Sequence, residues 1–179
     1  MFNLVKGIDE LEGVFSRPAA FRPLHDDPHR QDIAFRTELE MLVELTQEQR
    51  LGIGEDVFYD KSRIAIVPMA FCFPGYDAKG SDLPPPRICA DTWRRDIMDR
   101  LTGIRLTLLI GGYAQSWHLP DAANGVTRTV TAWRDTLPDT LPLPHPSWRN
   151  TGWLKKNPWF EAELLPVLKQ DVERLVARP

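Results

Sequence analysis

Arg63-Ile-Ala-Ile-Val67, followed by Pro68-Met-Ala-Phe-Cys-Phe-Pro-Gly75, is the stretch of this chain that decides its fold class. The first five residues form an apolar, β-branched run, which is typical of a strand buried on both faces. The Pro-Gly pair then indicates a sharp turn. Ligands of α/β sheets usually bind just past the carboxyl ends of the strands. The stretch therefore predicts a core strand that leads into a binding loop.

Two further segments repeat this pattern along the chain. A second strand is expected over residues 105–110, before Gly111-Gly112 and a helix to about His118, and a third, short strand over residues 141–143. Alternation of strands and helices is typical of a mainly parallel sheet with helices on both faces. We therefore predict an α/β protein, a three-layer α/β/α sandwich with a small, mainly parallel central sheet, in which residues 1–179 form a single domain.

The remaining helices are predicted from amphipathic spacing and from capping residues. They are expected over residues 2–15, 34–45, about 91–102 with Asp91 as the N-cap, 126–137 and 160–177, with loops over residues 16–30 and 77–87. On this basis residues 1–58 form a helical N-terminal part, and residues 59–179 form the α/β core.

His145-Pro146-Ser147-Trp148-Arg149-Asn150 follows the third expected strand. Proline fixes its own φ and forces the residue before it into an extended conformation. Pro144 and Pro146 therefore hold His145 in a stiff, extended loop, which favours an imidazole that is aimed at a ligand. A purely structural histidine in a proline-rich turn is the other interpretation of this loop.

The two motifs, in this order and each after a strand, resemble those of the uracil-DNA glycosylase superfamily. The first motif of that family ends in Pro-Gly, as at Pro74-Gly75, and its second is His-Pro-Ser, as at residues 145–147. The continuation to Arg149-Asn150 is similar to the single-strand-selective branch, with Trp148 in place of a proline. Residues 106–114 resemble the middle strand, glycine turn and helix start of the family, and the resemblance covers roughly residues 60 to 176.

The resemblance implies a monofunctional DNA glycosylase that hydrolyses the N-glycosidic bond of uracil or a related deaminated base in DNA, as in base excision repair. It gives His145 the role of donating a hydrogen bond to a base carbonyl oxygen, which stabilises the departing base. The target base must also leave the stack, and Trp148 or Arg149 fits the wedge that fills the gap. The DNA-binding residues implied in this way are Ser147, Trp148, Arg149, Asn150 and Lys155.

Two departures from the family pattern put the substrate base and the catalytic water in question. The family carries a water-activating Asp, Asn or Glu just before Pro-Gly, where this chain has Phe71-Cys72-Phe73. Besides Cys72, the candidates for this catalytic role are Asp77 or Asp82, a few residues further on. The asparagine with which the family reads uracil is replaced by Gly111-Gly112. The candidate base-binding residues are Met69, Phe71, Phe73, Pro74, Gly75 and Tyr76.

These departures keep two alternatives open. One is a diverged, non-catalytic member that binds a nucleobase or damaged DNA without cleaving it. The other is a different hydrolase, in which Cys72 is the nucleophile and His145 its base.

Composition and charge limit the classes of protein to which the chain can belong. With 42% hydrophobic and 26% charged residues, the chain can bury a core and is not disordered. Its net charge of −3 requires a local basic face for DNA, since phosphate contacts depend on Lys and Arg. Two cysteines cannot form a four-cysteine cluster, and the four histidines lack metal-ligand spacing. We expect no metal, no cofactor, no membrane span, and a cytoplasmic monomer whose partner is DNA with a damaged base.

Overall fold

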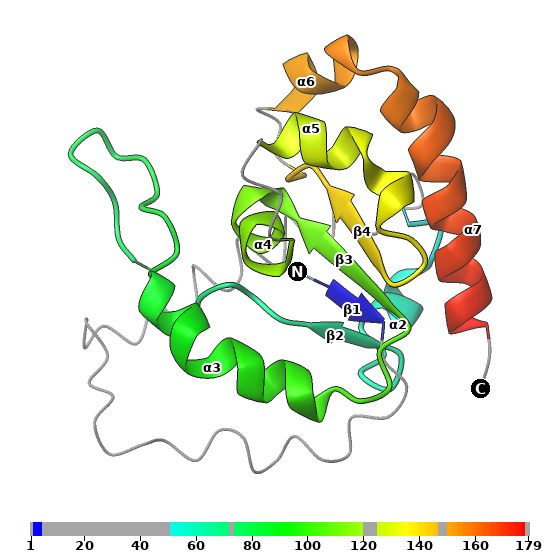
Figure 1. The fold of residues 1–179 in the computed structure, drawn as a ribbon, viewed down its shortest axis with the longest axis horizontal. Helices are drawn as coiled ribbons and strands as arrows, with labels where there is room; N and C mark the ends of the chain where they lie inside the picture. Colours follow the sequence, from blue (N-terminus) through cyan, green and yellow to red (C-terminus); the bar gives the residue numbers. More distant parts are fainter. Residues whose placement is uncertain (1, 5–50, 72–73, 120–124, 147–149, 178–179) are drawn as a thin grey trace.

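The computed structural model describes residues 2–4, 51–71, 74–119, 125–146 and 150–177 (Figure 1). Within these residues one four-stranded sheet has the order β2-β1-β3-β4. Its strands are β1 (Phe2–Leu4), β2 (Ile64–Ile66), β3 (Leu106–Ile110) and β4 (Thr140–Leu143). β3 and β4 are parallel, and β1 is antiparallel to both β2 and β3. Thus β2, β3 and β4 run in one direction, which confirms the predicted α/β class and its small, mainly parallel sheet.

The predicted helix over residues 2–15 is wrong at its start, because Phe2–Leu4 is a strand in the middle of the sheet. Asn3 pairs with Ala65 on one side and with Thr107 on the other. Three residues with apolar side chains at positions 2 and 4 fit strand alternation as well as a helical face. Phe2–Leu4 forms a strand and not a helix because it lies between β2 and β3 and pairs with both. Residues 5–50, which include the predicted loop over 16–30 and helix over 34–45, lie outside the described part of the chain.

The helices of the described residues differ from the expected ones mainly at their ends. They are α2 (Glu55–Phe58), α3 (Arg87–Arg100), α4 (Gly111–His118), α5 (Val126–Thr131), α6 (Thr151–Lys156) and α7 (Leu165–Val176), with a 3-10 turn at Trp133–Asp135 and a π turn at Phe160–Leu164. α3 begins directly after Pro86, not at Asp91, because helical geometry starts as soon as the proline run ends. α5 ends at Thr131, earlier than predicted, and α6 was not predicted.

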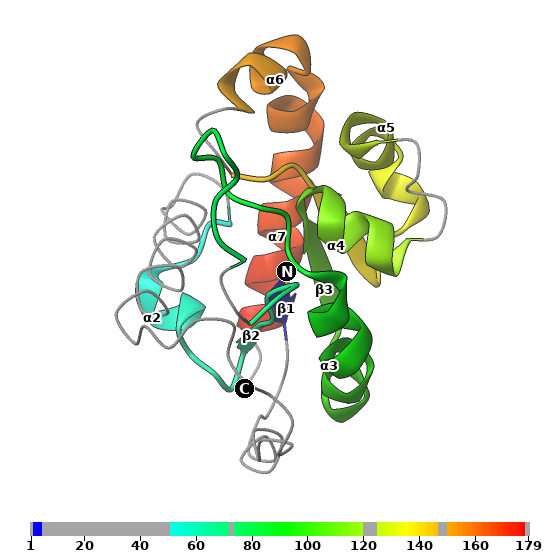
Figure 2. The ribbon, with the colours of Figure 1, turned by 90° about the vertical axis from the view of Figure 1, so that its left-hand side faces the viewer.

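Helices cover both faces of the sheet, which confirms the predicted α/β/α sandwich. Ile64 of β2 packs in one core cluster, with residues of β3, β4, α2 and α7, whereas the next residue, Ala65, packs in a second cluster with residues of α3 and α4. Figure 2 shows the sheet between α2 on one side and α3 on the other. The single-domain organisation over residues 1–179 stays a prediction.

The direction of the strands brings the two motifs to one edge. Because β2, β3 and β4 run the same way, their carboxyl ends lie at the same side of the sheet, where residues 67–71, Gly111 and His145 follow them. None of the helices in the described residues has the length and apolar character needed to cross a membrane.

Candidate functional site

His145 is the outward-facing residue of a tightly held loop. Pro144 and Pro146 on either side of it are buried, whereas His145 is exposed. The side-chain amide of Asn150 donates a hydrogen bond to the carbonyl oxygen of His145, which closes the loop on itself. Asn150 was predicted to bind DNA, and the structure gives it this internal contact. The loop therefore presents the imidazole from a fixed base.

Gly111, the first residue of α4, lies directly against the imidazole. Its φ is +78°, and a Cβ built on it would lie 3.4 Å from Cδ2 and 3.5 Å from Cβ of His145. Glycine permits this backbone conformation, and the separation is an ordinary van der Waals distance for an added Cβ. The end of β3 therefore forms one wall of the histidine site.

Gln115, one turn further along α4, joins the ends of β3 and β4. Its side-chain Nε2 donates to the carbonyl oxygen of Leu143 at 2.8 Å and to that of Leu109 at 3.3 Å. The residue is only 1% exposed. Sequence reasoning missed this contact, and the one signal for it was a glutamine in a helix expected to pack against the sheet.

Partial loss of solvent sets the protonation state of His145. Although the residue as a whole is exposed, enough protein surrounds the ring that desolvation lowers the pKa of its imidazole below the usual value. The ring is therefore neutral at pH 7 and carries one N–H donor and one acceptor nitrogen.

A buried arginine holds the beginning of the first-motif loop. Arg94 of α3 is 2% exposed, and its Nη1 donates to the carbonyl oxygens of Pro68 at 2.8 Å and Val67 at 3.3 Å. Its Nε donates to Nε2 of His118 at 3.1 Å. Desolvation, followed by the charge of Arg94, lowers the pKa of His118 to about 4, and desolvation lowers the pKa of Arg94 to about 10. This cluster was not foreseen, since its members are far apart in the sequence.

The Pro-Gly turn opens a projecting, hairpin-like loop. Gly75 has a φ of +96°, its carbonyl oxygen accepts from the backbone N–H of Leu83 at 3.0 Å, and Tyr76 forms an isolated bridge with Asp82. Oδ1 of Asp77 accepts from the backbone N–H groups of Lys79 and Ser81, both at 2.8 Å. Figure 1 shows this loop extending from the start of α3, away from the end of β4. Asp77 thus stabilises the loop tip and is not brought next to His145.

The sequence around this site matches a known protein family. Residues 22–169 match the family model described as the uracil DNA glycosylase superfamily. This span includes the Pro-Gly turn, Gly111 and the His145 loop, and it covers most of the chain. The chain belongs to the uracil DNA glycosylase superfamily. Membership gives it, in general terms, a DNA glycosylase-like function, that of a hydrolase of DNA repair with DNA as substrate.

The described residues around the Pro-Gly turn keep aromatic side chains open to solvent. Phe71 is 45% exposed and Tyr76 is 57% exposed. Met69, another candidate base-binding residue, instead packs against the core cluster under α3 and α4. Cys72 and Phe73 lie outside the described residues. Pro74 and Gly75 are half-buried at the turn.

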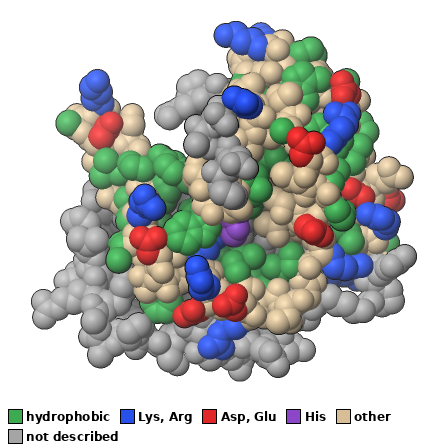
Figure 3. Space-filling view, viewed as in Figure 1, with side chains coloured by type: hydrophobic (Ala, Val, Ile, Leu, Met, Phe, Trp, Pro, Cys, Tyr) green, Lys and Arg blue, Asp and Glu red, His purple; other side chains and the backbone are tan. Residues whose placement is uncertain are grey.

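A short helix with two lysines follows the His145 loop in the sequence. Ser147, Trp148 and Arg149 lie outside the described residues, but α6 follows at once and exposes Lys155 and Lys156. Figure 3 shows Lys or Arg side chains over this end of the molecule. Among the described residues, no three His, Cys, Asp or Glu side chains gather as metal ligands do.

Proposed function

We propose that this protein is a monofunctional DNA glycosylase that hydrolyses the N-glycosidic bond of uracil or a related deaminated base. One observation carries the proposal: His145 stands exposed at the carboxyl end of β4, between two buried prolines and against Gly111. A fixed imidazole at this edge of the sheet is where an α/β protein of this superfamily would meet its ligand.

The reaction requires a group that stabilises the departing base. Water attacks C1′ of the sugar, the C1′–N bond breaks, and the base leaves with the bonding electron pair as an anion. Negative charge grows on the carbonyl oxygen of the base in the transition state. A preorganised N–H donor that faces this oxygen binds the transition state more strongly than the substrate.

The neutral form of His145 fits this role. Its lowered pKa leaves a single N–H to donate at pH 7, and the loop that holds it needs little rearrangement during the reaction. A donor that is already in place avoids the cost of reorganisation. His145 therefore acts as an electrostatic catalyst in the proposed mechanism.

DNA contacts are proposed along the chain that follows His145. Ser147 would bind a backbone phosphate, and Trp148 or Arg149 would occupy the space of the flipped base. Lys155 is exposed one helix turn into α6, which Trp153 ties to α5 through a hydrogen bond from its Nε1 to Oγ1 of Thr127 at 2.7 Å. This local positive charge offsets the acidic balance of the chain.

A diverged member that binds a base or damaged DNA without cleavage is the alternative function. Two observations favour it: Phe71-Cys72-Phe73 has no carboxylate before Pro74-Gly75, and Asp77, the substitute candidate for positioning water, has Oδ1 engaged at the loop tip. A hydrolase with Cys72 as nucleophile and His145 as its base is the third candidate function.

An excision assay distinguishes these functions. Oligonucleotides with one uracil, hypoxanthine, xanthine or mismatched thymine are incubated with the protein, as single strands and as duplexes. Excision that is lost in His145→Ala and kept in Cys72→Ser supports the glycosylase. Binding to one lesion without excision supports the non-catalytic member, and loss of a hydrolytic activity in Cys72→Ser supports the dyad.

A further inference from the structure

Gln115 occupies a position where a polar side chain is costly. Its amide is almost fully buried, and Oε1 has no hydrogen-bond donor among the described residues. An unpaired buried acceptor destabilises the folded state, so it calls for an explanation. The two hydrogen bonds that Nε2 of the same amide donates supply this explanation.

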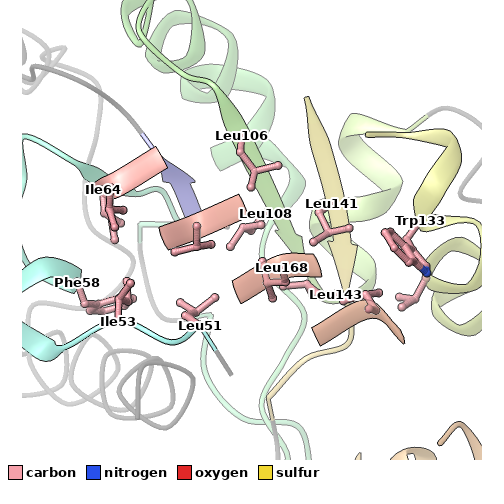
Figure 4. Packing of buried hydrophobic residues seen from close by; sticks show 14 of the residues in the cluster. Leu51, Ile53, Phe58, Ile64, Leu106, Leu108, Trp133, Leu141, Leu143 and Leu168 are labelled. Carbon is pink, nitrogen blue, oxygen red and sulfur yellow. The ribbon is translucent and has the colours of Figure 1, made fainter. Parts of the chain in front are cut away.

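The Nε2 group of Gln115 connects α4 to the strand that carries the catalytic candidate. It donates to the carbonyl oxygens of Leu109, near the end of β3, and Leu143, the last residue of β4. Leu143 lies two residues before His145. Its side chain is fixed in the core beside Leu141 and Leu168 (Figure 4). The backbone that enters the histidine loop is thus held by its side chain on one face and by Gln115 on the other.

The same helix also begins beside His145. Gly111 and Gln115 lie one turn apart in α4, and residues four apart share a helix face. Gly111 lies against the imidazole, while Gln115 sets the position of the backbone that precedes it. A shift of α4 relative to β4 would therefore change both contacts together.

We propose that Gln115 is a positioning residue, which fixes the imidazole of His145 through the carbonyl group of Leu143. The expected effect on kcat rests on the proposed glycosylase function, whereas the expected effect on the position of the His145 ring does not. Gln115 does not touch the substrate. It acts by keeping His145 within the narrow range of positions from which its N–H reaches the departing base.

A double-mutant cycle tests this role. The rates of wild type, Gln115→Met, His145→Ala and the double variant are compared on the best substrate. Methionine keeps the size of the side chain and removes both donated hydrogen bonds. We expect Gln115→Met to lower kcat about 10- to 100-fold with little change in KM. In the His145→Ala background it should have no further effect, because the group that it positions is gone.

Val176→Ala is the control for lost stability. Val176 is buried near the end of α7, and its carbonyl oxygen accepts from Arg63, which precedes β2, so that it lies at the opposite edge of the sheet from His145. This variant loses core packing without touching the histidine loop. It should keep the wild-type kcat per folded molecule. If its kcat falls as much as that of Gln115→Met, the effect of Gln115→Met on kcat comes from lost stability and not from the position of His145.

NMR titration of His145 supplies a readout that does not depend on excision. The His145→Ala spectrum assigns its imidazole signal. In Gln115→Met the signal should move and its pKa should rise toward the ordinary value, because a displaced ring regains solvent. If Gln115→Met does not fold, Gln115→Glu replaces it, since a protonated buried carboxyl donates only one of the two hydrogen bonds.

The outcomes separate the two proposals. An unchanged His145 titration, or losses in kcat that simply multiply in the double variant, overturns the positioning role. If the wild-type protein excises no base while the titration of His145 still shifts in the Gln115 variant, the proposed function fails and the positioning role stands.

Discussion

A Cβ atom at Gly111 would lie 3.4 Å from Cδ2 of His145, so the imidazole lies beside the start of α4, within van der Waals reach of a side chain placed there. The φ of +78° at Gly111 belongs to the region that L side chains rarely adopt. The backbone conformation thus requires glycine here, whereas an added Cβ would meet the ring at an ordinary van der Waals distance. The start of α4 therefore places backbone beside the candidate histidine.

Gly111→Ala should therefore impair both stability and excision. The positive φ should cost more than about 1 kcal/mol in the free energy of unfolding, as measured by urea denaturation. The added methyl would meet the imidazole at an ordinary van der Waals distance, so the expected loss of kcat comes from the shift of the strained backbone beside His145. Gly80→Ala is the matched control, because Gly80 has a φ of +77° and a Cβ added there would have no neighbouring atom within 4 Å. Equal losses of kcat in both variants would contradict the contact with His145.

His145→Ala should reduce turnover much more than binding. Removal of one preorganised donor typically costs about 10²–10³ in rate, whereas the donor contributes less to the ground state. Single-turnover excision and a separate binding titration on the same oligonucleotide measure the two effects. If affinity and rate fall by the same factor, His145 is a binding residue and not an electrostatic catalyst.

Acid should destabilise the protein through His118. In the unfolded chain a histidine takes up a proton below about pH 6.5, whereas folded His118, with a pKa of about 4, stays neutral. The unfolded state therefore binds more protons between these values, and stability falls as pH falls through this window. The shift corresponds to roughly 3 kcal/mol at most.

Urea denaturation between pH 7.5 and pH 4.5 checks this expectation. His118→Gln should flatten the pH dependence, because it removes the group that titrates. His145 contributes in the same direction, since its pKa is lowered too, so His145→Ala is measured in parallel. A slope that persists in both variants would place the acid sensitivity elsewhere.

Replacement of Trp148 and Arg149 by alanine should harm duplex substrates more than single strands. A duplex must be opened and its gap filled, whereas a single-stranded base is already unstacked. The ratio of kcat/KM for the two forms of one oligonucleotide measures this directly. A ratio equal to that of the wild type would remove the wedge from the mechanism.

Local sequence patterns were sufficient to predict the helices and strands whose conformation depends on neighbouring residues. The β-branched run before Pro68 and the apolar run before Gly111 are strands, and the helix that starts at Gly111 ends at His118, as predicted. Together with Pro74-Gly75 and His145-Pro146-Ser147, these elements were enough to indicate the superfamily.

The contacts that arrange the site were beyond such patterns. Arg94 reaches His118 and Pro68, and Gln115 reaches Leu143, across more than twenty residues of sequence in each case. No periodicity encodes which buried polar group finds which carbonyl oxygen. The strand at residues 2–4 was missed for a related reason, since its partners and not its own three residues determine its conformation.

That strand also constrains how the protein folds. β1 separates β2 from β3 and hydrogen-bonds to both, yet its partners lie far along the chain. Pairings between distant residues are slow to form, because the entropy of closing a long loop is lost before the contacts stabilise the chain. Until β1 inserts, β2 and β3 each present an unpaired edge, the kind of surface on which chains associate with one another. Refolding at low protein concentration should therefore give a higher yield of native protein than refolding at high concentration.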